Sequence, residues 1–225
     1  MLGTLINAAA VIMGSLIGLT IRTKLPQNIT TRVFQGIGLF TLFLGVHMAT
    51  KTNNFLILVF SIVIGSIIGE LIHIDSLVNS FGDWIKSKIN SSNSKFTDGF
   101  VTAFLLFCIG SMTILGAFEE GLGGKPNLLL AKSVLDGFAA MALSASLGIG
   151  VIFSVIPLIL YQGGLTVFAG SLQNFFSNTI IMELTAVGGL LLIGLGINIL
   201  EIKKLKILNM LPALVIAVIL AYLFL

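Results

Sequence analysis

Long apolar runs separated by short polar connections constrain this chain more than any other feature of its sequence. A helix rises 1.5 Å per residue, so about 20 apolar residues cross the hydrocarbon core of a bilayer. Charged residues make up 9% of the chain and hydrophobic residues 56%, whereas soluble domains carry about 25% charged residues. We therefore expect an all-α, polytopic membrane protein in contact with the lipid bilayer. The small positive net charge gives no reason to expect a nucleic acid partner.

Seven to eight membrane segments are predicted, because one region is ambiguous. Residues 133–171 are too many for one helix and few for two, and Pro157 with the pair Gly163–Gly164 would interrupt a helix there. We expect either a broken, kinked unit or a pair of short helices. In the second case the segments are about 2–21, 33–49, 55–74, 99–118, 133–152, 155–171, 182–200 and 208–225.

The basic residues favour two crossings of 133–171. Cytoplasmic loops of membrane proteins carry an excess of Lys and Arg. With one crossing, the 12 basic residues divide six against six; with two, they divide nine against three, the nine being Arg22, Lys24, Arg32, Lys86, Lys88, Lys95, Lys203, Lys204 and Lys206. Eight segments with both termini outside the cytoplasm are therefore predicted, and 75–98 becomes a cytoplasmic loop. Within it, Leu77, Phe81, Ile85 and Trp84 fall on one face at helical spacing, which is typical of an amphipathic helix lying at the membrane interface.

Two sequence patterns occur twice. GLFTLFLGVH at 38–47 and GLLLIGLGIN at 189–198 run in opposite directions in the eight-segment arrangement, which predicts an inverted repeat unless the likeness is chance. GSLIG and GSIIG place glycines four residues apart, on one helix face, where another backbone can approach closely. The glycines are Gly14, Gly18, Gly65 and Gly69. Their contacts could lie within one subunit or form a homo-oligomer.

Candidate functional residues gather in the interrupted region. With the interrupted region starting at residue 133, we expect no charged residue near the middle of any span. Irregular backbone together with polar side chains is instead expected to bind a small solute or ion. The predicted site residues are Asp136, Ser144, Ser146, Tyr161, Gln162, Gly163, Ser111 and Glu70. Two alternatives are open: Asp136 could simply pair with Lys132, and Glu70 could anchor its span at the interface.

The sequence offers no set of residues for catalysis or metal binding. It has one cysteine and two histidines, His47 and His73, both at span ends. No Ser/His/Asp, thiolate or His-rich arrangement is evident, so we expect neither an enzyme nor a bound cofactor or metal.

The runs CIGSMTILG, KSVLDGFAAMALSASLGIGVIFSVIP and LYQGGLTVFAG resemble the YdfK/YqgA-like bacterial membrane proteins, a family defined by a domain of unknown function. The resemblance covers nearly the whole chain, including the opening GTLIN, GSIIGE and the closing NMLPAL. It implies an integral protein of the bacterial plasma membrane, sometimes described as a transporter, without a known substrate. It adds support for Asp136 and Gln162. Ser111, Thr113 and Glu120–Gly121 depart from the family pattern, which puts a site at that end of the fourth span in doubt.

Two functions follow as hypotheses. The interrupted polar region within an inverted repeat favours a transporter or channel for a small solute or ion. The expected absence of mid-span charge, together with the glycine packing motifs, favours a non-transporting scaffold or accessory subunit instead.

Overall fold

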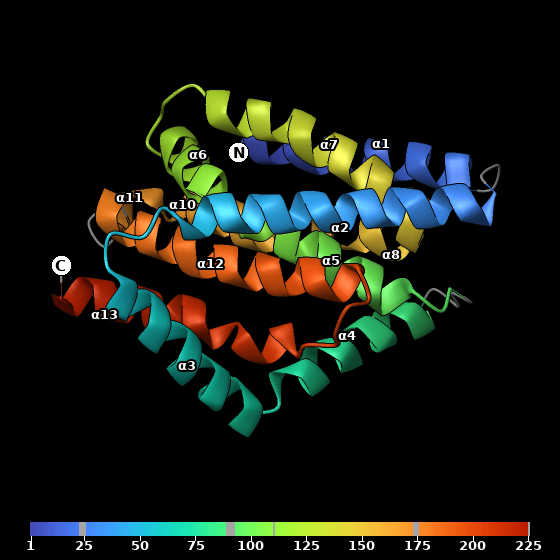
Figure 1. The fold of residues 1–225 in the computed structure, drawn as a ribbon. Helices are drawn as coiled ribbons and strands as arrows, with labels where there is room; N and C mark the ends of the chain where they lie inside the picture. The colour runs from blue at the N-terminus through green and yellow to red at the C-terminus, as the bar shows by residue number, and fades with distance from the viewer. Residues whose placement is uncertain (23–25, 89–92, 110, 173–175, 225) are drawn as a thin grey trace. The chain divides into compact units, whose positions relative to one another are not determined.

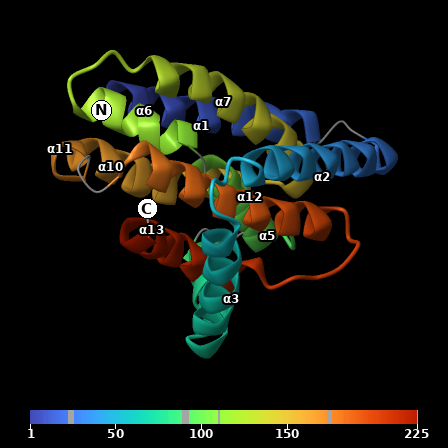
Figure 2. The ribbon, with the colours of Figure 1, turned by 60° about the vertical axis from the view of Figure 1, so that its left-hand side comes forward.

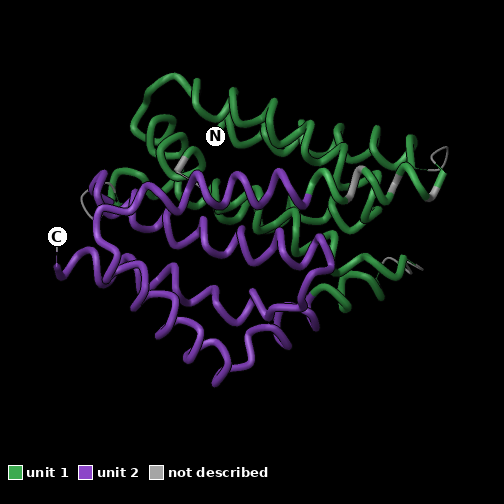
Figure 3. Tube along the Cα trace, viewed as in Figure 1, with its two compact units in different colours: residues 1–37, 82–173 green, residues 38–81, 174–225 purple. Residues whose placement is uncertain are grey.

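The computed structural model describes residues 1–22, 26–88, 93–109, 111–172 and 176–224, and within these ranges its regular structure is helical throughout (Figure 1). This confirms the all-α class. Five helical stretches are long and apolar enough to cross a membrane, and two bent helix pairs raise the number to seven. The chain divides into two compact units, unit 1 with residues 1–37 and 82–173, and unit 2 with residues 38–81 and 174–225 (Figure 3).

Helix α1 (Leu2–Arg22) and helix α7 (Asn127–Leu147) lie side by side in unit 1, as Figures 1 and 2 both show. They run parallel, since Gly14 lies against Gly137 and Gly18 lies against Met141 further along both helices. A Cβ atom on either α1 glycine would overlap a carbonyl oxygen of α7. The predicted GSLIG contact is therefore made inside the chain, because only glycine lets the two backbones approach this closely.

The ambiguous region contains two stretches of spanning length, α7 and the residues Gly150–Val167. Helix α7 begins at Asn127, well before residue 133, and ends where Gly148 adopts a φ of +90°. Only glycine adopts such a conformation readily, so the chain turns there rather than at Pro157. The sequence predicted no charged residue near the middle of any span, and this expectation is wrong. Asp136 is the tenth of the 21 residues of α7 and lies in the middle of an apolar helix.

The second stretch is helical but irregular. It consists of α8 (Gly150–Phe153), α9 (Val155–Leu158), the π-helical turn η1 (Ile159–Gly163) and α10 (Gly164–Val167), and α11 (Ala169–Leu172) follows. Pro157 has no N–H to donate to the helix turn before it, which disturbs the regular hydrogen bonding at this point. The wider turn that follows changes which side chains face the interior.

The rest of unit 1 includes helices α5 (Phe96–Cys108) and α6 (Ser111–Gly121), bent by 60° at the break between them. Buried apolar side chains of α1, α5, α7 and the irregular stretch form its core, among them Val11, Phe107, Leu143 and Leu158. The N-termini of both parallel helices are held by neighbouring acids. Gly3 of α1 donates its N–H to Glu120, 2.8 Å away, and Leu128 of α7 donates to Glu119, 3.1 Å away.

Unit 2 contains the predicted repeat. In α2 (Gln27–Ala49) and α12 (Asn178–Ile199), the last glycine of each repeated motif packs on the first glycine of the other. A Cβ on Gly45 would lie 2.7 Å from the Gly189 oxygen, and one on Gly196 would lie 3.0 Å from the Gly38 oxygen. The two helices are therefore antiparallel, with equivalent residues exchanged across the contact, as an inverted repeat predicts.

A second antiparallel pair follows in unit 2. Helices α3 (Phe55–Leu71) and α13 (Pro212–Phe224, preceded by the 3-10 turn η2, Ile207–Met210) meet where Gly65 lies against Ala213 and Gly69 against Asn209. The GSIIG glycines are thus also occupied within the chain. A homo-oligomer through Gly14, Gly18, Gly65 and Gly69 would have to displace these contacts, so any oligomer is expected to use other surfaces.

Helix α4 (Ile74–Lys88) follows α3 at a bend of 62°, where His73 has a φ of +54°. Leu77, Phe81 and Trp84 are exposed on α4, and the Lys88 ammonium lies 5.9 Å from the centre of the Trp84 ring. These three side chains form an exposed apolar stripe of the kind expected of an interfacial helix, whereas Ile85, which was predicted on the same face, is buried.

Candidate functional site

A buried ion pair lies in the middle of α7. Lys132 donates a hydrogen bond to Asp136, one helical turn later, and the two residues are only 5% and 7% exposed. Charged groups at such positions need a partner, because low-dielectric surroundings cannot replace the water that they lose. The pairing that the sequence left open as an alternative is therefore present, at a depth that the sequence did not predict.

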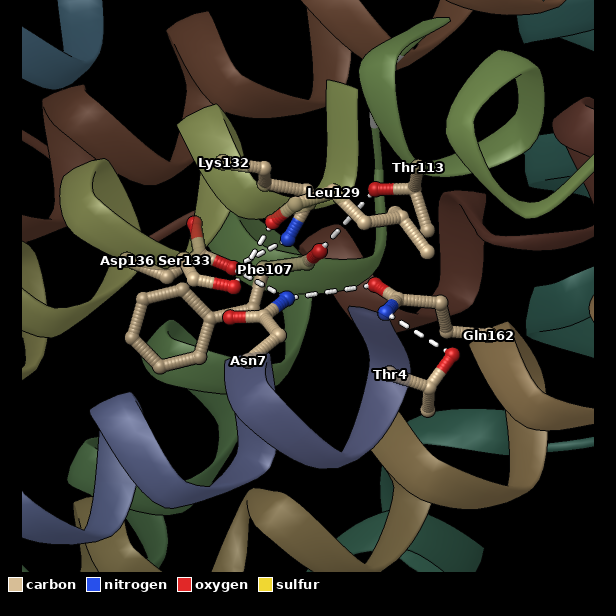
Figure 4. Close-up of polar contacts among 9 residues, drawn as sticks. All are labelled: Thr4, Asn7, Phe107, Thr113, Leu129, Lys132, Ser133, Asp136 and Gln162. Atoms are coloured by element: carbon tan, nitrogen blue, oxygen red, sulfur yellow. Dashed lines mark hydrogen bonds and ion pairs between the residues drawn. The ribbon is translucent and has the colours of Figure 1, made fainter. Parts of the chain in front are cut away.

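Asn7 of α1 connects this pair to the π-helical turn. Its Nδ2 donates to Asp136 Oδ2 at 3.1 Å and to Gln162 Oε1 at 3.2 Å (Figure 4). Gln162 in turn donates through Nε2 to the Thr4 hydroxyl at 3.2 Å, and the Thr166 hydroxyl lies 3.5 Å from that of Thr4. Three segments separated in sequence, namely α1, α7 and the irregular stretch Gly150–Val167, thus contribute to one buried group of polar residues, which we call the polar network: Thr4, Asn7, Lys132, Asp136, Gln162 and Thr166.

One acceptor of the polar network has no partner. Asn7 is fully buried, and its Oδ1 atom receives no hydrogen bond. The amide cannot be turned over to correct this, because Oδ1 would then face two acceptors, Asp136 Oδ2 and Gln162 Oε1. A buried carbonyl oxygen without a donor costs about 1–3 kcal/mol. The arrangement therefore presents an oxygen that a cation or a hydrogen-bond donor would stabilise.

The sequence-predicted site residues do not all meet here. Asp136 and Gln162 belong to the polar network, and Gly163 beside it is buried, with its Cβ position 3.8 Å from the Thr4 methyl group. Ser144 and Ser146 are buried on α7, and neither hydroxyl has a hydrogen-bond partner. Tyr161 is 38% exposed, so the π-helical turn directs Gln162 inward and leaves its neighbour outside the network. The side chain of Ser111 lies outside the described part of the structure.

Glu70 belongs to unit 2 and has its own partners. Its carboxylate accepts hydrogen bonds from Lys206 at 2.7 Å and from the Asn209 amide at 2.6 Å. The Asn209 oxygen accepts the Asp75 N–H at 2.6 Å. Hydrogen bonding and charge attraction from Glu70 raise the pKa of Lys206 above its usual value. These contacts join the α3–α4 bend to the segment just before α13, and an anchoring role for Glu70 stays a prediction.

Four members of the polar network were not predicted as site residues: Thr4, Asn7, Lys132 and Thr166. Thr4 and Asn7 occur in the opening GTLIN, one of the runs that carry the family resemblance, and they lie three residues apart on one face of α1. Lys132 opens the KSVLDG run. The spacing of Lys132 and Asp136 did contain a signal, because an i,i+4 pair of opposite charge can neutralise itself within an apolar helix.

The polar network contains one carboxylate. Among the described residues, no group of three or more His, Cys, Asp or Glu side chains is placed to hold a metal ion. The donors and acceptors of the polar network are instead two carboxamides, two hydroxyls and the ion pair. Such a set can bind and orient a small polar or charged species through hydrogen bonds and oxygen coordination.

Comparison with known proteins identifies relatives along almost the whole chain. Residues 2–222 match the family described as "Protein of unknown function (DUF554)". The uncharacterized protein YqgA of Escherichia coli K12 is 34% identical over 221 residues, covering 96% of this chain and 94% of the relative. The uncharacterized membrane protein YdfK of Bacillus subtilis 168 is 33% identical over 224 residues, covering 96% and 93% respectively. No solved structure matches the chain.

These relatives agree with the resemblance noted in the sequence. The description of YdfK as a membrane protein and the apolar helices of the chain together indicate a membrane protein. Because both the family match and the relatives extend over nearly all of its residues, the chain belongs to the DUF554 family of proteins of unknown function.

Proposed function

We propose that the chain is a transporter or channel for a small solute or ion, which binds at the polar network. The observation that carries the proposal is the π-helical turn η1, which brings Gln162 into contact with Asn7 and, through Asn7, with Asp136. π-helical turns are rare and often occur at functional sites. An ionisable residue within a membrane helix is costly to keep and usually serves a substrate or ion pathway.

The order of the helices supports the same proposal. Asn7 meets Gln162 and Thr4 meets Thr166, so α1 runs antiparallel to the irregular stretch Gly150–Val167. Helices α1, α2 and α3 therefore each have an antiparallel partner later in the chain, and the partners follow in the same order. Many transporters are built from inverted repeats whose interrupted helices form the binding site.

The proposal is tested with the purified protein in proteoliposomes, using a counterflow screen of labelled metabolites and ions. We expect flux of at least one of these, reduced at least tenfold by Gln162→Leu and by Asp136→Asn while the melting temperature stays measurable. Ser133→Ala is the matched control. Ser133 is buried on the same helix, but its hydroxyl donates to the Leu129 carbonyl of that helix, 2.7 Å away. Folded wild-type protein that moves none of the compounds tested would contradict the proposal.

We further propose that the protein lies in the bacterial plasma membrane with both termini outside the cytoplasm. The nine-to-three distribution of basic residues supports this orientation, and both relatives named above are bacterial. Alkaline phosphatase fused after residue 225 should be active, whereas a fusion within the 201–206 loop should be inactive. The opposite pattern would exclude the orientation.

A second candidate is a non-transporting scaffold or accessory subunit. Its supporting observation is that most of the polar network is satisfied internally, as a structural clamp between α1, α7 and η1 would be. A partner protein that co-purifies at fixed stoichiometry, together with an absence of flux, would favour this function over transport.

A further inference from the structure

We infer that the polar network binds a small monovalent metal cation, of the sodium class, which replaces the Lys132 ammonium at the Asp136 carboxylate. The inference rests on the proposed function and names the species for its site. It depends on three features of the network: an oxygen acceptor without a donor, a carboxylate that is fixed in place, and a lysine that can leave it.

The available oxygen atoms suit a hard cation. Asn7 Oδ1 is buried without a donor, while its Nδ2 is held by Asp136 Oδ2 at 3.1 Å. The nitrogen and oxygen of one carboxamide lie about 2.3 Å apart, so the free oxygen belongs to the side chain that contacts the carboxylate, and a cation bound beside that carboxylate would coordinate it. Carboxylate and carbonyl oxygens are the ligands that such cations prefer. Coordination would therefore satisfy this buried oxygen, which receives no hydrogen bond from the protein.

Charge balance indicates a monovalent ion in exchange with Lys132. The ammonium and the carboxylate neutralise each other, so a cation added to the intact pair would leave one uncompensated positive charge in buried surroundings. If the cation takes the place of Lys132 at Asp136, the carboxylate stays neutralised once the ammonium withdraws. A divalent ion would require further carboxylates, and none of the other residues of the network supplies one.

Lys132 is the partner that can leave, and Asp136 is the one that stays. Asp136 has a short side chain and is held from α1 by the Asn7 amide. Lys132 carries a point charge on a flexible four-carbon stem. Lys132 is the sixth residue of α7. Its ammonium can therefore reach toward the N-terminal end of the helix when a cation occupies the Asp136 carboxylate.

Thermal melting of the full-length protein in detergent tests this inference. Melting is followed at increasing sodium or lithium chloride, with choline chloride keeping the total salt constant. The wild type should melt at progressively higher temperature with sodium or lithium but not with choline. Asp136→Asn should lose this response. Lys132→Gln, which removes the tethered competitor, should reach half of the response at a sodium concentration lower by about tenfold or more.

Glu70→Gln is the matched control, because it removes a carboxylate that also pairs with a lysine but lies in unit 2. This variant should respond to sodium as the wild type does. A wild type that does not distinguish sodium and lithium from choline would overturn the inference, as would an unchanged sodium response in Asp136→Asn. If Asp136→Asn does not fold, the inference is tested by comparing the sodium dependence of melting in the wild type and in Lys132→Gln. Solute flux that requires Gln162 but not sodium would overturn the cation site and leave the proposed function standing.

Discussion

Asn7 and Asp136 are 129 residues apart in the chain, yet the Asn7 amide donates to the Asp136 carboxylate at 3.1 Å in the buried centre of unit 1. The same nitrogen donates to Gln162 at 3.2 Å. One short side chain of the first helix thus joins the ion pair of α7 to the π-helical turn. Asn7 is therefore the link between the two predicted residues Asp136 and Gln162.

Replacing Asn7 with alanine should lower stability and solute flux together. The change leaves Gln162 Oε1 without a donor and removes one of the two hydrogen bonds to Asp136, and leaving one buried polar group unpaired costs about 1–3 kcal/mol. Reversible unfolding in mixed micelles measures the free energy of unfolding. Asn28→Ala is the control, since Asn28 is exposed on α2. Equal effects of the two substitutions would show that the contacts of Asn7 contribute nothing.

Removing only one member of the Lys132–Asp136 pair should lower the stability of the protein more than removing both. Lys132→Met alone leaves an uncompensated buried carboxylate, which typically costs about 3–5 kcal/mol. The double variant Lys132→Met, Asp136→Leu removes both charges and fills the space with apolar atoms. We expect it to be more stable than Lys132→Met and to lack flux. If the separate effects of Lys132→Met and Asp136→Leu on the free energy of unfolding simply add in the double variant, the two residues do not interact in the folded protein.

The lengths of the apolar runs predict the fold class, because the bilayer thickness sets the helix length. The glycine spacings predict close helix contacts, and the structure pairs Gly14 with Gly137 and Gly65 with Ala213. The start of α7 was not predictable in the same way. Taken singly, each of the charged residues Lys132 and Asp136 indicates the polar end of a span. They are compatible with the interior of a span only because they neutralise each other as an ion pair.

The interior side chains of the site were also hard to predict. A single asparagine in an apolar run shows no partner until the tertiary fold brings one, which is why Asn7 was missed. Tyr161 and Gln162 are adjacent, and the sequence gives no reason to separate them. Consecutive helical residues face about 100° apart, and tertiary packing of the π-helical turn buries Gln162 while Tyr161 stays partly exposed.

Gly14→Ala should disrupt the α1–α7 contact, and Gly170→Ala should not. The new Cβ at residue 14 would overlap the Gly137 oxygen, so the helices must separate along a contact built on small residues. At Gly170 no atom outside the local helix lies within 4 Å of the Cβ position, and alanine has the higher helix propensity. Melting temperatures of the two variants give the comparison. A stable Gly14→Ala variant would mean that the close approach is absent in solution.

The ion pair between Lys206 and Glu70 should add a pH-dependent contribution to stability. Glu70 raises the pKa of Lys206 in the folded protein. The contribution is therefore complete at pH values below the pKa of lysine in the unfolded chain, and it is lost as the pH rises through the higher folded value. The melting temperatures of the wild type and Lys206→Met should differ by a constant amount near neutral pH and converge in strongly alkaline buffer. A difference that stays constant across the alkaline range would contradict this assignment.

Glu183 should be essential for the start of α3. It is fully buried on α12, and its carboxylate accepts hydrogen bonds from Thr52 Oγ1 at 2.6 Å, Asn53 N at 2.7 Å and Asn54 N at 3.1 Å. Its partners lie just before α3, and the Asn54 side chain itself accepts the first N–H groups of that helix from Leu56 and Ile57, so Glu183 holds the residue that caps α3. Hydrogen bonds to a charged group contribute about 1.5–3 kcal/mol each, so Glu183→Ala should destabilise the protein by several kcal/mol. Glu183→Gln keeps one acceptor oxygen, so its stability should lie between that of Glu183→Ala and that of the wild type.

Hydrogen exchange should locate the loss of protection at the N–H groups of Asn53 and Asn54. Protection there that is unchanged in Glu183→Ala would show that the residues before α3 are held by other contacts.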